Sequence, residues 1–407
     1  MCNFVIIRLR DDGKGGEMMS AVNVKIEPEI INWALSQTKE EKLGENMMSN
    51  ISHWLKGTKT PTFRQIEDLS KKTNIPLGYF FLETPPVEEI KLLEYRTVGS
   101  IQVDNPSRNL IDKIYEMERI QDWMKEYRRD RGFDVSTIVG STKGIQNIGV
   151  IVERIRRDLE LKEIWHNECR DVPDAFNYIR KKLEECGIIV MMSGVVGSNT
   201  HRALDINEFR AFAMIDDWAP LIFINSVDSI RARLFSLFHE AVHIWMGEDD
   251  FYNDRVSDLE SLRETEKICN EVAGELIAPK QEFLRMWNNL LGENEVPFII
   301  TELAKRFHSS EIVIARKALD NKKISQKSYY EIVEKTMEQY KQLKEKKKNS
   351  GGNYYNTMSS RLDSNFVKAL CESISIGRTS YTEAYRLTNT SRKTFSEVTQ
   401  TLGGVEW

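Results

Sequence analysis

Two histidines and a glutamate in the segment His239-Glu240-Ala241-Val242-His243 have the types and spacing of a metal site. On an α-helix, residues four positions apart share a face with Cβ atoms about 5–6 Å apart, so both imidazoles can bind one metal ion. Glu240 would then lie beside the ion, where it can take a proton from an attacking water and give it to a leaving amine. The spacing therefore predicts metal-dependent peptide hydrolysis with Glu240 as the catalytic residue.

The surroundings of this segment favour a metal site over a chance pattern. Apolar residues occupy most of the flanking positions and predict a buried helix: Leu234, Phe235, Leu237, Phe238, Val242, Ile244 and Trp245. In such a helix two histidines and a glutamate would be costly unless a metal satisfied them. The alternative is an HExxH pattern that arose by chance on a structural helix, and the small number of histidines, six in 407 residues, argues against it.

A catalytic zinc site takes three protein ligands and leaves the fourth position for water, so a later helix should supply one more ligand. Glu264, Glu266 and Glu271 are the candidates. Glu266 is favoured because Asn270, one turn later, lies on the same helix face and can hydrogen-bond a ligating carboxylate, whereas the other two glutamates fall off that face. Cys269 is predicted to be a small buried side chain, and its use as a soft ligand is the alternative.

Substrate binding leaves weaker signals in the sequence. An extended peptide is expected to pair with an edge strand, for which Phe209–Ile215 is the candidate. Three residues have side chains of a type that can stabilise an oxyanion: His201, Tyr252 and His308. No other feature of the sequence supports this role, so each is expected to be an ordinary loop or surface residue.

Composition limits the class of protein. The chain has 407 residues, 41% of them hydrophobic and 29% charged, enough for several globular domains. A net charge of −5 excludes a histone-like polycation. No apolar run approaches the roughly 20 residues that span a bilayer, and the N-terminus lacks a signal-peptide core, so we expect no membrane partner. The five cysteines are scattered without paired spacing, which is typical of a reducing cytoplasm.

The sequence predicts a mostly helical α+β fold. Short β-branched or aromatic runs predict strands at 188–192, 209–215 and 221–225, followed by a long helix from about residue 228. Changes in composition divide the chain into six segments: 1–19, outside the fold, with the native start expected at Met18 or Met19; 20–86, a helix-turn-helix bundle; 87–169, a helical connector; 170–297, the metallopeptidase domain with a small β-sheet; 298–348, a helical extension and linker; and 349–407, a C-terminal helical piece.

Residues 20–86 read as five short helices of a helix-turn-helix domain. In the expected recognition segment Asn50, Ser52 and His53 can reach base edges, and Lys56 can meet a phosphate. The charge does not favour DNA, because residues 20–85 hold eight Lys or Arg and eight Asp or Glu, a net charge of zero. A module for packing or dimerisation is the alternative, with a homodimer as the partner.

Four stretches resemble the ImmA/IrrE family of metallopeptidases: Asp205–Ala213, Ala219–Asn225, Phe235–His243 and Glu266–Pro279. The N-terminal motifs resemble the XRE-type helix-turn-helix that many members carry: Trp54-Leu55-Lys56-Gly57, Pro61-Thr62, Tyr79-Phe80-Phe81-Leu82 and Pro85-Pro86. Two further motifs resemble the C-terminal tail of these proteins: Gly351-Gly352-Asn353-Tyr354-Tyr355 and Gly377-Arg378-Thr379-Ser380-Tyr381.

This resemblance implies a gluzincin-like site in which His239, His243 and Glu266 bind Zn²⁺ and Glu240 is the general base. It also implies a cytoplasmic endopeptidase whose substrate is a regulator protein, such as a repressor, in mobile-element, stress or defence regulation. The alternative is a helix-turn-helix transcriptional regulator or a toxin–antitoxin component in which the metal site is sensory or inactive.

Overall fold

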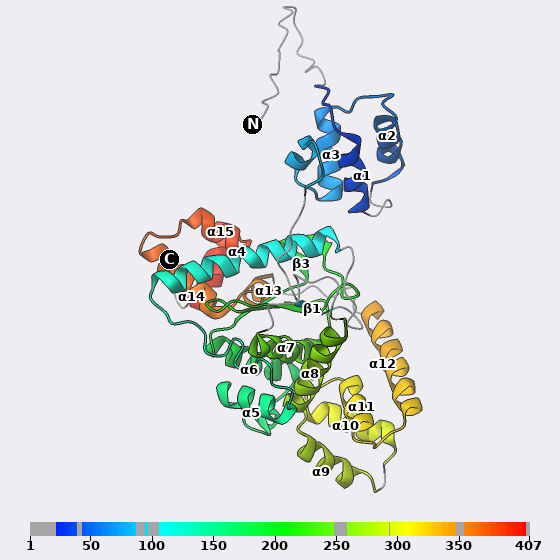
Figure 1. The fold of residues 1–407 in the computed structure, drawn as a ribbon, viewed down its shortest axis with the longest axis vertical. Helices are drawn as coiled ribbons and strands as arrows, with labels where there is room; N and C mark the ends of the chain where they lie inside the picture. The colour runs from blue at the N-terminus through cyan, green and yellow to red at the C-terminus, as the bar shows by residue number, and fades with distance from the viewer. Residues whose placement is uncertain are drawn as a thin grey trace, which may run out of the picture. The chain divides into compact units, whose positions relative to one another are not determined.

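The computed structural model describes residues 22–38, 43–86, 94–96, 106–247, 259–292, 294–346 and 354–403. The chain forms two compact units, Met1–Glu89 and Ile90–Trp407. Helices dominate both, and the second contains a small sheet (Figure 1), so the predicted α+β class is confirmed. None of the helices in the described ranges combines the length and hydropathy needed to cross a bilayer.

The first unit has four helical segments in its described residues: α1 (Pro28–Ser36), α2 (Glu45–Leu55), α3 (Phe63–Thr73) and the 3-10 helix η2 (Leu77–Phe81). A proline in the first turn starts α1, and a reciprocal capping box between Thr62 and Gln65 starts α3. Their apolar faces meet in one core around Ile30, Trp54 and Phe80. Residues 39–42 lie outside the described residues, so the expected total of five helices stays a prediction.

The sheet of the second unit has the strand order β1-β5-β6-β2. Its strands are β1 (Glu94–Arg96), β2 (Ile189–Ser193), β5 (Ala211–Met214) and β6 (Leu221–Asn225). All pairings are antiparallel except that of β2 with β6. The three predicted strands are present within two residues of their expected ends. A separate hairpin of β3 (Val195–Val196) and β4 (Asn199–Ala203) was not predicted.

The position of β5 corrects one expectation. Its residues Ala211–Ala213 pair with β1 on one side, and Ala211–Met214 pair with β6 on the other. The segment Phe209–Ile215 is therefore no edge strand, and the prediction that substrate pairs there directly is wrong. The prediction failed because β1 lies in a charged stretch expected to be helical, and three residues are too short to show the alternation of a strand.

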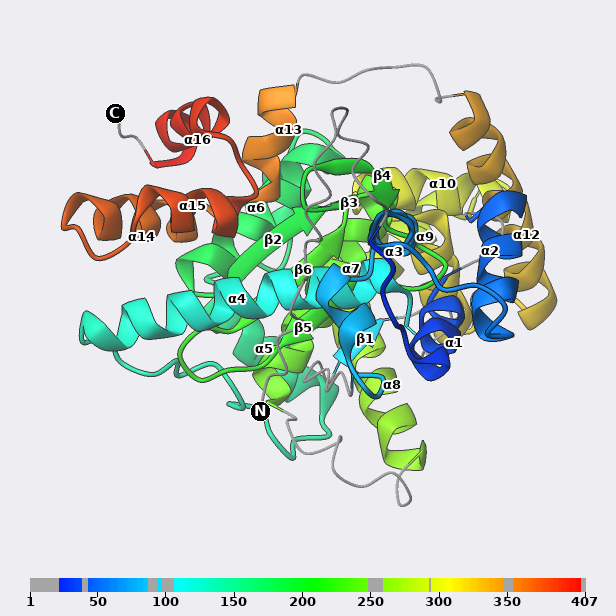
Figure 2. The ribbon, with the colours of Figure 1, turned by 90° about the horizontal axis from the view of Figure 1, so that it is seen from above.

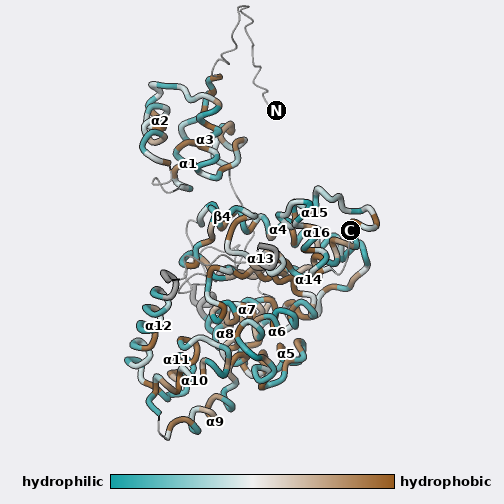
Figure 3. The backbone as a smooth tube through the Cα atoms, turned by 180° about the vertical axis from the view of Figure 1, so that it is seen from behind, coloured by the Kyte–Doolittle hydropathy of each residue, from teal (hydrophilic) through white to brown (hydrophobic). Residues whose placement is uncertain are grey.

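One face of the sheet packs against the helices that carry the candidate site. Alternate strand residues such as Val190, Ala213 and Ile222 point into this core, as the period of two requires. The helices on this side are α5 (Ile148–Asp158), α6 (Val172–Glu185), α7 (Ile230–Met246), α8 (Leu259–Ile277), α9 (Lys280–Leu290), α10 (Val296–Arg306) and α11 (Glu311–Asp320), with α12 (Gln326–Lys346) following. Figure 3 shows hydrophobic segments of these helices interleaved with hydrophilic ones.

The opposite face packs against α4 (Arg108–Asp130) and the C-terminal helices. Met191, Phe212 and Phe223 point into this second core. The C-terminal helices are α13 (Tyr354–Arg361), α14 (Ser364–Ser375), α15 (Tyr381–Thr388) and α16 (Arg392–Val398). The helix α4 runs across the strands in Figure 2, and Figure 1 shows α7 on the other side, so the second unit has three layers.

A buried polar cluster joins the C-terminal helices to β2. Asp363, the N-cap of α14, accepts hydrogen bonds from the backbone N–H groups of Phe366 (2.7 Å) and Val190 (2.9 Å). Arg180 of α6 donates to the Val190 carbonyl (2.8 Å). Side chains thus satisfy both backbone groups of Val190 on this edge strand. Burial, together with the charge of Glu184, raises the pKa of Asp363 to about 7.

This raised pKa predicts a pH dependence of stability. The folded chain keeps a proton on Asp363 that the unfolded chain releases near pH 4, so the stabilisation is present below about pH 4 and is lost as the pH rises through about 7. Asp363 should therefore make the free energy of unfolding fall with rising pH by at most about 1.4 kcal/mol per pH unit.

Chemical denaturation between about pH 4 and 7 tests this expectation. The free energy of unfolding of Asp363→Asn should depend less steeply on pH than that of the wild-type protein, even where the variant is less stable overall. The matched control is Asp171→Asn, which changes the exposed N-cap of α6 and should keep the wild-type slope. A slope unchanged by Asp363→Asn would refute the assignment.

Candidate metal centre

The helix α7 carries the HExxH segment through the middle of the second unit. Its N-terminus is capped by Ser229, whose hydroxyl accepts a hydrogen bond from the Ala232 N–H (3.2 Å). Its C-terminus ends at Gly247, where φ is 60° and an added Cβ would lie 2.3 Å from Gly140 Cα. Only glycine fits both the left-handed backbone and this close approach. The last turns of α7 are therefore held in one position.

Three side chains from two helices converge at the candidate site. His239 and His243 of α7 are 0% and 2% exposed, and their Nε2 atoms are 3.2 Å apart. Glu266 comes from α8, which packs along α7. Its carboxylate oxygens lie 3.4 Å from His239 Nε2 and 3.3 Å from His243 Nε2. Among the described residues these three form the group of donor atoms close enough to hold one metal ion.

The spacing of these atoms fits zinc. Ligand atoms about 2.0–2.1 Å from a tetrahedral Zn²⁺ are separated by about 3.3 Å. The distance between the two Nε2 atoms, 3.2 Å, is close to this value, and each Nε2 is at a similar distance from its nearer Glu266 oxygen: 3.4 Å from His239 Nε2 to Oε2 and 3.3 Å from His243 Nε2 to Oε1. Two imidazoles and one carboxylate are also a ligand set that zinc hydrolases use with an open fourth position. The Glu266 side chain is 27% exposed, so this candidate ligand is itself partly open to solvent.

Electrostatics keep the carboxylate charged. Burial by itself would raise the pKa of Glu266, but the hydrogen bonds and charges of His239 and His243 hold that pKa well below its usual range. An ionised carboxylate is the form that binds a metal. Glu240, next to His239 on α7, is 1% exposed. A buried carboxylate that follows a candidate ligand on the same helix is the residue expected to act as general base.

Cys269 is the residue that sequence reasoning undervalued. It is fully buried on α8, one turn after Glu266, and its Sγ lies 3.6 Å from His243 Nδ1 and 3.8 Å from Met246 Sδ. The thiol therefore contacts the nitrogen of His243 that faces away from Glu266. The three-residue spacing from Glu266 to Cys269 predicts that both lie on one face of α8. The spacing does not predict that Cys269 contacts His243 on α7. Asn270 is half-buried, and its predicted hydrogen bond to Glu266 stays a prediction.

The candidates for the oxyanion have different surroundings. His308 is buried, and its Nε2 lies 3.1 Å from the His166 carbonyl and 3.2 Å from the Cys169 carbonyl, so the ring is engaged by backbone. His201 is exposed on β4. Tyr252 lies outside the described residues.

The four residues predicted to contact DNA belong to the first unit. Asn50, Ser52 and His53 lie on α2, and Lys56 follows as its C-cap. Ser52 and Lys56 are exposed, whereas Asn50 and His53 are half-buried. His53 is also held locally, since its Nδ1 lies 2.9 Å from Thr58 Oγ1. The structure thus groups these residues on one short helix, and contact with DNA stays a prediction.

An HExxH helix under a small sheet, with a glutamate from the next helix near both histidines, is the arrangement expected of a metallopeptidase. Residues 184–319 match the family described as IrrE N-terminal-like domain, Peptidase_M78, and this range contains His239, Glu240, His243 and Glu266. The match supports the ImmA/IrrE family for this part of the chain and a metallopeptidase-family function in general.

The other comparisons add little about function. Residues 362–400 match a domain of unknown function, DUF8813, which covers α14, α15 and α16. Neither a curated protein nor a solved structure gives a significant match to the chain.

Proposed function

We propose that the chain is a zinc-dependent endopeptidase that cleaves a cytoplasmic regulator protein, such as a repressor, in mobile-element, stress or defence regulation. The observation that carries the proposal is the convergence of His239 Nε2 and His243 Nε2, 3.2 Å apart, with the Glu266 carboxylate, whose two oxygens lie 3.3–3.4 Å from them. Glu240 follows His239 in the sequence and is buried. The family match at residues 184–319 supports the reaction class. The regulatory role rests on the resemblance and on the helical first unit.

The residues divide the work of hydrolysis. Zn²⁺ held by His239, His243 and Glu266 would lower the pKa of a water and polarise the scissile carbonyl. Glu240 takes the proton of the attacking water and delivers it to the leaving amine. Glu240 is 1% exposed, so we infer that packing around α7 limits its movement during the reaction.

A proteome comparison tests the proposed function. We expect one protein to be lost in cells that carry the wild-type chain and to be retained in cells that carry Glu240→Gln. That protein is the substrate. Metal analysis of the purified chain should give about one zinc per chain. Zinc well below one per chain, or matching proteomes under the conditions that induce the protein, would contradict an active zinc peptidase.

A transcriptional regulator is the second candidate function. The first unit is compact by itself, and its α2 exposes Ser52 and Lys56, which can meet a base edge and a phosphate. Binding of the chain to its own promoter, weakened by Lys56→Ala and unaffected by Glu240→Gln, would favour this reading. Equal affinity for unrelated DNA would count against it.

Cys269 offers a prediction about the metal site itself. When Nε2 of His243 binds a metal, Nδ1 carries the hydrogen and donates it towards Sγ of Cys269, 3.6 Å away. Cys269→Ala removes this acceptor, and we expect zinc affinity to fall roughly 10–100-fold, as for other partners of ligating histidines. Cys269→Ser should give an intermediate loss because its oxygen reaches less far.

Competition with a zinc chelator dye measures these affinities. Cys371→Ala is the matched control, because it also truncates a buried cysteine of the second unit, but on α14 in the other core. If both alanine variants bind zinc equally well, Cys269 only fills space.

A further inference from the structure

The last three α-helices of the second unit carry a polar surface that the metal centre does not use. Figure 2 shows α14, α15 and α16 together at one end of this unit. These helices lie within residues 362–400, the segment that matches a domain of unknown function. Apolar side chains such as Ala384 and Phe395 bury one side of α15 and α16 in the core shared with α4 and the sheet. The other side of both helices is polar and exposed.

The connection between α15 and α16 is a tight turn. The three residues Asn389–Ser391 join the two helices. Asn389 takes the left-handed backbone with φ of 52°, and Ser391 caps α16 by accepting a hydrogen bond from the Thr394 N–H (3.3 Å). Two helices joined by a turn of about three to four residues are the signature of a helix-turn-helix.

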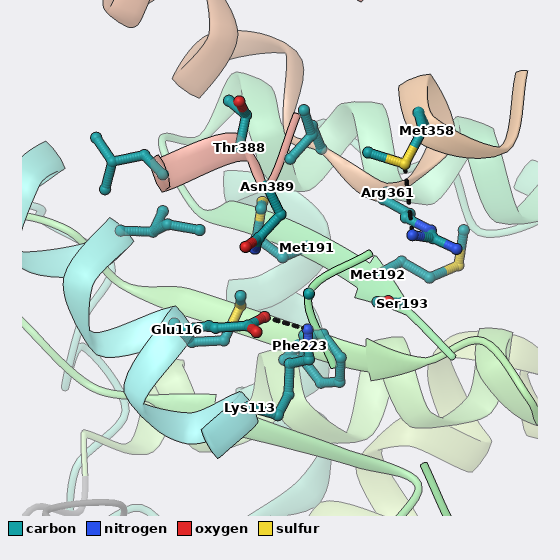
Figure 4. Close-up of a pocket in the computed structure, with 15 residues that line it drawn as sticks. Lys113, Glu116, Met191, Met192, Ser193, Phe223, Met358, Arg361, Thr388 and Asn389 are labelled. Carbon is teal, nitrogen blue, oxygen red and sulfur yellow. Dashed lines mark hydrogen bonds and ion pairs between the residues drawn. The ribbon is translucent and has the colours of Figure 1, made fainter. Parts of the chain in front are cut away.

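Contacts fix the two helices to each other and to the second unit. The rings of Tyr385 on α15 and Phe395 on α16 pack edge to face, with their centroids 5.4 Å apart. Figure 4 shows the Asn389 side chain pointing towards Met191 of β2. A Cβ added at Gly197 would lie 3.5 Å from Asn389 Oδ1, so the turn also lies against the β3–β4 hairpin. The inner side of the motif is thus held in place, and α16 presents its other side outwards.

The outward face of α16 has the composition of a nucleic-acid contact. Arg392, Lys393 and Ser396 are exposed and lie within about one helical turn. The helix continues into the π-helical η5 (Thr399–Gly403), so this face extends beyond α16 itself. Arginine and lysine bind phosphates, and arginine and serine also reach base edges. In a helix-turn-helix, residues near the start of the second helix are the ones that contact bases.

Charge separates this segment from the rest of the chain. Residues 376–403 hold four Lys or Arg and two Asp or Glu, a net charge of +2, whereas the whole chain has a net charge of −5. Arg386, Arg392 and Lys393 form no ion pair with any part of the chain that the structure describes. A nucleic acid gains affinity from such cations because its phosphates release counterions on binding.

We propose that α15 and α16 form a second helix-turn-helix that binds duplex DNA, with the outward face of α16 in the major groove. Arg392 and Lys393 contact phosphates and base edges there, and Arg386 of α15 adds a positive charge to the exposed side of the motif. The domain of unknown function is then a DNA-binding module on the face of the sheet opposite α7. This contact is separate from any made by the first unit and does not depend on peptidase activity.

Fluorescence anisotropy of the full chain with a labelled random-sequence DNA duplex tests the proposal. At about 0.1 M salt the double variant Arg392→Ala with Lys393→Ala should bind roughly 10–100-fold more weakly, because two phosphate contacts are lost. The slope of log affinity against log salt should become shallower by about two. Both positions are exposed, so the melting temperature should stay at the wild-type value.

The matched control is Lys305→Ala with Arg306→Ala. This variant also removes two adjacent exposed cations, but from α10 on the other side of the sheet, and it should bind the duplex as the wild-type protein does. Equal losses in the two double variants would indicate a general effect of charge and would overturn the proposal. Absence of salt-dependent binding by the wild-type chain would also overturn it.

Two further variants locate the contact. Ser396→Glu places a carboxylate on the outward face of α16 and should weaken binding about tenfold or more; wild-type affinity in this variant would exclude this face from the groove. Lys56→Ala changes the first unit, and the loss caused by the α16 double variant should persist in its presence. If Lys56→Ala alone abolishes binding and the α16 variant binds normally, or if an RNA duplex of the same sequence binds more tightly than the DNA, the proposal is wrong.

Discussion

Replacing Glu240 by glutamine should reduce peptide hydrolysis by roughly 10²–10⁴-fold, the usual contribution of a general acid–base group. The amide has nearly the same shape as the carboxylate but does not accept the proton of the attacking water. Because Glu240 is not one of the three candidate ligands, zinc should remain bound. The expected signature is therefore a large loss of the catalytic rate with an unchanged zinc content.

The rate is measured on the substrate that the proteome comparison identifies, with zinc content determined on the same samples. Glu264→Gln is the matched control, since it makes the same change at an exposed position on α8 near Glu266 and should leave the rate unchanged. A Glu240→Gln variant that still cleaves at the wild-type rate would remove Glu240 from the mechanism.

Replacing His243 or Glu266 by alanine should lower zinc affinity by more than the roughly 10–100-fold that loss of a ligand's hydrogen-bond partner costs. Each change removes one of the three side chains that meet at the site, with closest approaches of 3.2–3.4 Å, and leaves two protein ligands. Two ligands do not define the tetrahedral site that zinc prefers. Both variants should also lose hydrolysis, in contrast to Glu240→Gln, which loses hydrolysis alone.

The alternative ligands provide the controls for this second prediction. Glu264→Ala and Glu271→Ala change the other two glutamates considered from the sequence, and both side chains are exposed on α8. Their zinc affinity should match that of the wild-type protein in a chelator competition. If Glu271→Ala or Glu264→Ala loses zinc and Glu266→Ala does not, the third ligand is misassigned and the geometry of α8 differs from that described here.

The local parts of the site could be predicted because helix geometry is local. The four-residue spacing of His239 and His243 places both rings on one face of any α-helix, and the apolar flanks indicate that the helix is buried. The same reasoning separated Glu266 from Glu264 and Glu271 by their faces on the next helix. Strands with several β-branched residues, such as Leu221–Asn225, were also predictable because their composition is distinctive.

Contacts between distant segments were not predictable. The pairing of β1 with β5, which removes the expected edge strand, joins residues more than a hundred positions apart, and three charged or aromatic residues give no periodic signal. The contact between Cys269 and His243 depends on how two helices cross, and the outward face of α16 depends on where the C-terminal helices dock.

By itself, the order of residues determined the helices, the main strands and the faces on which the reactive side chains lie, because backbone hydrogen bonds repeat every few residues. Only the tertiary structure decided that two imidazoles and one carboxylate meet at distances of 3.2–3.4 Å, and that α16 exposes Arg392 and Lys393. Such distances are set by the packing of whole helices and sheets, whose free energy is shared among many side chains far apart in the chain.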